Sequence, residues 1–280
     1  MKLTIVDVFA ERALAGNQLA VIQQCQGLSD ERMQDIAREM NFSETTFVIT
    51  EGDGEADVRI FTPAQELPFA GHPTVGTAWV LSGGEGQITL NLKAGAVPVS
   101  FEDGVGWMAP PPVQLGDTFG RAKTAELINL PVEALDPDYP IRFAEVGPRF
   151  ILIGVRDLAA LKAAKLDGDL HRSYVEAGLG VQCVFVFTTE SYGPDADFAS
   201  RMFFDTGGVR EDPATGSANT AFAAYLYDLK RDEFDAVVDQ GIEILRPSRL
   251  YLRVGPTPRV GGRTQMVVSG TFDAGVAGDS

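Results

Sequence analysis

An eight-residue pattern occurs twice in this 280-residue chain, and the two copies lie 140 positions apart, which is half the length of the chain. The first copy runs from Gly71 to Ala78 and the second from Glu211 to Ala218. Their Pro, Gly, hydroxyl and Ala positions match without a gap, and a strand-like Arg-x-Phe segment precedes each copy, at 59–61 and 201–203. Two copies are too few for a solenoid, so we predict an internal repeat that folds into two similar lobes.

Each copy is predicted to begin a helix. His72 and Asp212 are the expected N-cap residues, and Pro73 and Pro213 follow at the first helical position, where the missing N–H costs nothing. The next backbone N–H groups have no partner within the helix, and the helix dipole favours negative charge beside them. Two such helix starts are suited to a small, polar molecule that carries a carboxylate.

The small residues of the pattern support this interpretation. Gly76 and Gly216 leave room for a ligand or another backbone to approach, while Thr77 and Ser217 supply hydroxyl groups.

The two motif copies differ in their first chemical group. Asp-Pro is a routine way to begin a helix, whereas histidine is a poor N-cap and titrates near neutral pH. His72 is therefore the stronger candidate for a chemical role. The other histidine, His171, lies in a polar stretch and is expected to be an exposed helix residue.

Charge and cysteine content exclude several classes of function. The net charge of −16 argues against a nucleic-acid surface and against binding to anionic membranes. No stretch approaches the roughly 18 apolar residues of a membrane span. Cys25 and Cys183 lie far apart without metal-like spacing, so we predict no metal site, no disulfide and a cytoplasmic location. A small anionic substrate stays compatible with the net charge, because charges more than about 8 Å away are largely screened.

Glu44 is a further candidate because it lies between a predicted helix at 29–40 and a predicted strand at 45–50, a common place for functional side chains. It would serve as a general acid or base if partial burial raised its pKa toward neutrality. The alternative is a surface glutamate at the start of a strand, or a partner for Arg59.

Strand and helix patterns alternate along the chain and divide it in two. The linker signal Ala109-Pro110-Pro111-Pro112 places an N-terminal lobe at 1–115, completed by the C-terminal strand 264–280, and a C-terminal lobe at 116–263. The other predicted strands are at 2–9, 18–23, 58–62, 88–92, 97–101, 151–155, 181–188, 201–204, 249–254 and 265–272, and the other helices at 74–81, 119–130, 157–166, 168–177 and 213–229.

Three separated blocks, at 41–47, 61–74 and 211–218, together resemble the PhzF-like phenazine-biosynthesis isomerase family, as do the segments 6–9 and 16–22. The resemblance implies the diaminopimelate-epimerase-type fold. This is an α+β fold of two similar lobes, each a curled mixed β-sheet (a barrel or roll) around a central helix, with the substrate bound between the lobes. The apolar helix at 214–226 has no clear polar face and suits the central position.

The resemblance also implies an isomerase that shifts a proton without a cofactor, and a homodimer. The residue that matches the proton shuttle is Glu44, while His72 and Asp212 match residues that orient and polarise a small carboxylated substrate. The residues that match its binding site are Gly71, Ser217 and nearby amides such as that of Gly216. The substrate itself is not named by these motifs, and phenazine synthesis is not implied.

The sequence departs from relatives at three kinds of position. Gln18 stands where many relatives have proline, and Asp205 stands where they tend to have an apolar residue, so it could add negative charge near the site. The cysteine pair of the related epimerases is absent from both helix starts, and neither Cys25 nor Cys183 replaces it by position. A two-thiol racemisation is therefore disfavoured.

Two alternatives stay open from the sequence. One is an epimerase or racemase of a small acid that uses Glu44 with His72 or Asp212 in place of thiols. The other is a non-catalytic protein that binds a metabolite in the same site.

Overall fold

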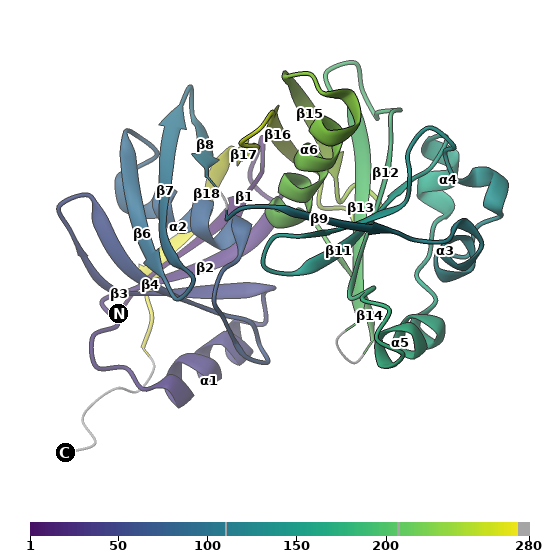
Figure 1. The fold of residues 1–280 in the computed structure, drawn as a ribbon. Coiled ribbons are helices and arrows are strands. Elements are labelled where there is room, and N and C mark those ends of the chain that lie inside the picture. The colour runs from purple at the N-terminus through teal and green to yellow at the C-terminus, as the bar shows by residue number, and fades with distance from the viewer. Residues whose placement is uncertain (110, 206–207, 274–280) are drawn as a thin grey trace. The chain divides into compact units, whose positions relative to one another are not determined.

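The computed structural model describes residues 1–109, 111–205 and 208–273 (Figure 1). The chain divides into two compact units, one formed by Met1–Ala109 with Gly261–Ser280 and the other by Pro110–Val260. Pro110 of the predicted linker and residues 274–280 of the predicted C-terminal strand lie outside the described residues.

The first unit is a mixed sheet with the strand order β18-β1-β2-β3-β4-β6-β7-β8, and β5 pairs with the end of β4. Helix α2 contacts strands from both ends of this order, namely β18 and β1 at one end and β7 and β8 at the other, so the sheet curls around it (Figure 1). Its elements are β1 (Lys2–Val8), β2 (Asn17–Gln23), α1 (Asp30–Met40), β3 (Glu44–Gly52), β4 (Glu55–Phe61), β5 (Glu66–Leu67), α2 (Gly71–Ser82), β6 (Gln87–Leu92), β7 (Gly95–Glu102), β8 (Val105–Met108) and β18 (Thr264–Thr271), and β17 (Arg259–Gly262) spans the boundary between the units.

Two strand starts lie beside each other in this sheet. Strands β1 and β2 form an antiparallel hairpin in which Val8 is opposite Asn17, and β2 runs parallel to β3 with Leu19 opposite Glu44. Because parallel strands begin at the same edge of a sheet, Asn17 and Glu44 both lie at that edge.

Helix α2 packs against β1 and β2 through a residue without a side chain. A Cβ atom added at Gly76 would lie 2.6 Å from Val8 Cγ2 and 2.7 Å from Leu19 Cδ2. The space predicted there for a ligand or a backbone is thus filled by side chains of the sheet. The helix is buried on all sides over its first eight residues, and it ends at Gly83, whose φ of +71° suits glycine.

The second unit is also a mixed sheet, with the strand order β9-β10-β11-β12-β13-β15-β16, and β14 pairs with the end of β13. Helix α6 contacts β9, β10, β11 and β16. Its large side chains, such as Phe222 and Tyr225, are therefore buried against this sheet. The elements are β9 (Gln114–Thr118), α3 (Arg121–Leu127), the short 3-10 helix η1 (Val132–Ala134), β10 (Arg142–Glu145), β11 (Arg149–Gly154), α4 (Leu158–Ala163), α5 (Gly168–Glu176), β12 (Cys183–Thr188), β13 (Phe198–Asp205), β14 (Val209–Asp212), α6 (Gly216–Lys230), β15 (Phe234–Gln240) and β16 (Ser248–Val254).

The close approach at Gly76 generates a stability prediction. Replacing Gly76 with Ala places a methyl group against two fully buried side chains, and such overpacking costs about 1–3 kcal/mol. The control is Gly52→Ala, because Gly52 is exposed and has no atom within 4 Å of the added Cβ; its effect should stay within about 0.5 kcal/mol. Urea unfolding of both variants measures the difference, and a Gly76→Ala protein as stable as the control would contradict this packing.

Candidate active site

Glu44 and His72 meet in the first unit. Glu44 is the first residue of β3, its side chain is 16% exposed, and its Oε2 lies 3.5 Å from Nε2 of His72, which is 5% exposed. The structure therefore brings together two of the three predicted catalytic residues, one from a strand start and one from the first turn of α2.

Asn17 contacts the opposite side of the imidazole ring. Its amide Nδ2 lies 3.3 Å from Nδ1 of His72. The imidazole is thus held at Nδ1 by a buried contact with Asn17, while its Nε2 lies on the side of Glu44. Asn17 was not among the predicted site residues, although it belongs to the segment 16–22 that carries part of the family resemblance.

Burial governs the charge of the histidine. Loss of hydration lowers the pKa of His72 to about 3, and an interaction with the backbone of Gln18 opposes this shift only in part. His72 is therefore neutral at physiological pH, and its contact with Glu44 joins a carboxyl group to an uncharged imidazole.

Asp212 lies in the second unit as the last residue of β14, where it pairs with Met202 of β13 and is 8% exposed. Its Oδ2 accepts a hydrogen bond of 2.5 Å from Oγ1 of Thr215, and its backbone oxygen accepts one of 2.9 Å from Nε2 of Gln240. Thr215 and Gln240 were not predicted as site residues. Gln240 lies in β15, a strand that the sequence patterns did not indicate.

The predicted N-cap positions are wrong in both copies of the motif. Helix α2 begins one residue before His72 with Ala70 as its N-cap, and Pro73 lies within the first turn, where its missing N–H is tolerated. Helix α6 begins four residues after Asp212 with Thr215 as its N-cap, because Asp212 stays in the extended strand β14.

The predicted binding residues lie at these two helix starts. Gly71 and Gly216 are the first residues of α2 and α6, and Ser217 is the second residue of α6 and is buried. Their N–H groups belong to first turns, which have no intrahelical acceptors.

The alternative in which Glu44 pairs with Arg59 is wrong. The guanidinium of Arg59 donates to both carboxylate oxygens of Glu66, at 2.8 and 3.0 Å, and to Asp30 at 2.5 Å. Asp205, at which the sequence departs from its relatives, also has local partners. Its carboxylate contacts Arg172 of α5 and accepts a hydrogen bond from the backbone of Gly208.

The second histidine is buried, which corrects the expectation that it is exposed. His171 is 3% exposed, and its Nε2 lies 2.8 Å from the backbone oxygen of Val181. The polar sequence around it did not indicate this long-range contact between α5 and the segment before β12.

Neither cysteine is an activated thiol. Burial raises the pKa of Cys25 to about 11 and that of Cys183 to about 12, the latter also through the nearby negative charge of Asp212. A thiol is a nucleophile or base only as the thiolate, so these two residues do not support a two-thiol mechanism at neutral pH. Among residues 1–109, 111–205 and 208–273, no group of three or more His, Cys, Asp or Glu side chains is placed to hold a metal ion.

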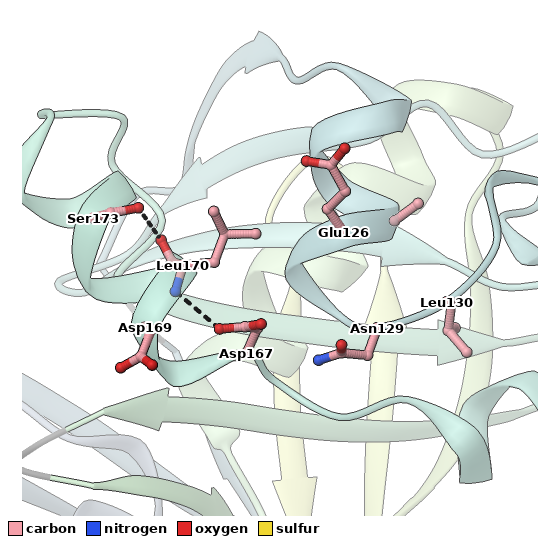
Figure 2. Close-up of a pocket in the computed structure, with 8 residues that line it drawn as sticks. Glu126, Asn129, Leu130, Asp167, Asp169, Leu170 and Ser173 are labelled. Atoms are coloured by element: carbon pink, nitrogen blue, oxygen red, sulfur yellow. Dashed lines mark hydrogen bonds between the residues drawn. The ribbon is translucent and has the colours of Figure 1, made fainter.

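A surface pocket of about 650 Å³ in the second unit does not contain the candidate residues (Figure 2). Two of its polar side chains stabilise helix α5. Asp167 accepts from the backbone of Leu170 at 2.9 Å, and Ser173 donates to the backbone oxygen of Leu170 at 2.7 Å (Figure 2). We therefore do not assign the active site to this pocket.

Comparison with known proteins gives consistent matches over almost the whole chain. The family model described as phenazine biosynthesis-like protein matches residues 6–272. A trans-2,3-dihydro-3-hydroxyanthranilate isomerase of Pseudomonas aeruginosa is 39% identical over 259 residues, which cover 89% of this chain and 88% of the relative.

Solved structures agree with the sequence matches. A PhzF-family phenazine biosynthesis protein of Bacillus anthracis has a TM-score of 0.86 and 26% identity over 96% of this chain and 97% of its own. A predicted epimerase of Pseudomonas aeruginosa has a TM-score of 0.80 and 32% identity over 97% of this chain and 98% of its own. These likenesses confirm the predicted α+β fold class. No helix in the described part of the chain is long and apolar enough to cross a membrane.

The buried imidazole generates a prediction for stability against pH. The folded-state pKa of His72, about 3, lies below the value near 6.5 expected in an unfolded chain, so the unfolded chain binds a proton that the folded chain does not. Stability should therefore fall as pH falls from about 6.5 toward 3, by up to about 1.4 kcal/mol per pH unit from this residue. Urea unfolding at pH 7, 6 and 5 should show a smaller loss for His72→Gln than for the wild type. Equal slopes, or an imidazole NMR titration of His72 between pH 6 and 7, would contradict the assignment.

Proposed function

This chain belongs to the phenazine biosynthesis-like family and is an isomerase of the PhzF type, and we propose that it shifts a proton within a small carboxylated substrate without a cofactor. The proposal rests on the buried contact of 3.5 Å between the carboxyl group of Glu44 and the neutral imidazole of His72. A relative is named trans-2,3-dihydro-3-hydroxyanthranilate isomerase. We propose this compound, a cyclic amino acid with a carboxylate and a hydroxyl group, as the first substrate to test.

In the proposed reaction Glu44 acts as the proton carrier. Its carboxylate takes a proton from one carbon, the electrons of that C–H bond move into the adjoining double-bond system, and the same carboxyl group returns the proton to another carbon. Atoms and electrons balance, so the reaction needs no oxidant or reductant.

The other candidate residues bind and polarise the substrate in this proposal. His72 and Asp212 orient its polar groups and exchange protons with them. The amides of Gly71 and Gly216 and the hydroxyl group of Ser217 bind its carboxylate or a developing oxyanion, which helix starts favour.

We further propose that the lobes 1–115 with 264–280 and 116–263 arose by duplication. The same series of pairings supports this origin, since in each unit an antiparallel hairpin is followed by a parallel pair, an antiparallel pair and a second parallel pair.

Side-chain geometry supports the duplication independently. Arg59 on β4 binds both oxygens of Glu66 on β5 and lies 5.1 Å from the ring centre of Phe61. Arg201 on β13 binds both oxygens of Glu211 on β14 and lies 4.7 Å from the ring centre of Phe203. The same arrangement of Arg, Glu and Phe side chains thus accompanies each motif copy.

A cytoplasmic homodimer is part of the proposal. The free thiols of Cys25 and Cys183 are compatible with a reducing compartment, and the dimer is inferred from the family resemblance.

Replacement of Glu44 tests the proposed chemistry. We expect Glu44→Gln to lower the isomerisation of trans-2,3-dihydro-3-hydroxyanthranilate, and the exchange of its carbon-bound hydrogen with D₂O, by about 10²- to 10⁴-fold, because the amide cannot carry the proton. The matched control is Glu55→Gln, since Glu55 is exposed on β4 and should leave the rate unchanged. Full exchange in Glu44→Gln would remove Glu44 from the mechanism. Inversion at a chiral centre without a double-bond shift would indicate an epimerase, and binding without exchange in the wild type would indicate a metabolite-binding protein.

A further inference from the structure

Gln240, the last residue of β15, is 1% exposed and uses every hydrogen-bonding position of its side chain. Its Nε2 donates to the backbone oxygen of Asp212 at 2.9 Å and to Oγ1 of Thr215 at 3.1 Å. Its Oε1 accepts from the backbone nitrogen of Thr215 at 3.3 Å and from Nδ2 of Asn219 at 3.0 Å. One amide therefore connects the end of β14 to the first turn of α6.

The orientation of this amide follows from its partners. A backbone N–H can only donate and a backbone oxygen can only accept, so a flipped amide at Gln240 would place its NH₂ group against the N–H of Thr215 and its oxygen against the backbone oxygen of Asp212. The NH₂ group must therefore face Asp212 O and Thr215 Oγ1.

This orientation decides where the hydroxyl proton of Thr215 points. Because Oγ1 of Thr215 accepts from Gln240, its own proton is free to be donated to Oδ2 of Asp212, 2.5 Å away. A hydroxyl group that donates to a carboxylate forms a short, charge-assisted bond that favours the ionised form and fixes the plane of the carboxylate.

We propose that Gln240 is a positioning residue that controls Asp212 through Thr215. By keeping the hydroxyl proton of Thr215 directed at Oδ2, it favours the ionised form of the Asp212 carboxylate and holds it in a single orientation. This inference rests on the proposed role of Asp212 in catalysis. The adjacent carboxylate of Glu211 has a separate partner, because it binds Arg201 at 2.7 and 3.0 Å, and so it does not compete for the hydroxyl group.

Gln240→Glu tests the direction of this chain of bonds. The variant has nearly the same shape but replaces the NH₂ donor with an acceptor, so the Thr215 hydroxyl group should turn toward the new carboxylate and leave Asp212. With trans-2,3-dihydro-3-hydroxyanthranilate we expect kcat to fall about 10- to 100-fold while KM changes much less. The matched control is Gln34→Glu, which removes one bond of 2.8 Å from a glutamine amide to the backbone oxygen of Thr62 in the first unit.

A second pair of variants keeps the proposal testable if Gln240→Glu does not fold. Thr215→Val removes the hydroxyl group and should lower kcat to a similar extent, whereas Thr215→Ser retains the hydroxyl group and should restore kcat to near the wild-type value. A purely structural role of the methyl group would give the opposite order.

Crystal structures separate this inference from the proposed function. In Gln240→Glu we expect the distance from Thr215 Oγ1 to Asp212 Oδ2 to exceed about 3.5 Å, beyond a hydrogen bond, whereas Gln34→Glu should retain the bond. If the wild type does not isomerise the test compound, the proposed function fails while this distance still decides the role of Gln240. An unchanged bond and Asp212 rotamer in Gln240→Glu, or an unchanged kcat in the folded variant, would overturn the proposal.

Discussion

Helices α2 and α6 have small or apolar residues on nearly every side of their first turns, and such a surface is stable only when it is enclosed. In each unit the sheet provides this enclosure. Gly76 shows how closely the packing is matched in the first unit, because even one methyl group would overlap side chains of β1 and β2. As a consequence, the polar residues near the start of each helix are buried as well, and burial governs their chemistry.

Buried polar groups have to be hydrogen-bonded, because an unsatisfied one costs about 1–3 kcal/mol. In each unit a buried amide lies close to a proposed catalytic residue. In the first, the amide of Asn17 contacts the ring of His72, and in the second the amide of Gln240 acts on Asp212 through Thr215. In both cases an amide that does not titrate holds the neighbouring acid or base, directly in the first unit and through a hydroxyl group in the second. The proposed site thus combines a neutral imidazole with a separate carboxylate, and the proton carrier is a third group, Glu44.

Local sequence patterns predicted the helices and many of the strands, but they missed strands such as β15 and several element ends. The strand before each motif and the helix after it follow from periodicity. Glu44 and His72, which the family resemblance predicts as site residues, lie 3.5 Å apart. The prediction of Asp212 as an N-cap was wrong because Asp212 pairs with Met202 in the sheet, and this pairing decides where α6 begins. His171 was wrongly expected to be exposed, and Gln240 was not predicted as a site residue. Their contacts involve segments 10 and 28 positions away, respectively, which the local pattern does not indicate.

The central claim is that a single carboxyl group, that of Glu44, both removes and returns the proton. It can be tested with a substrate that carries deuterium at the carbon that loses its hydrogen, followed through a single turnover in H₂O. Because the side chain of Glu44 is only 16% exposed, we expect part of the deuterium to appear at the carbon that gains the hydrogen. If the first turnover released all of the label to solvent, whether the substrate is converted quickly or slowly, transfer by a single carboxyl group would be contradicted. Two separate bases would then be indicated.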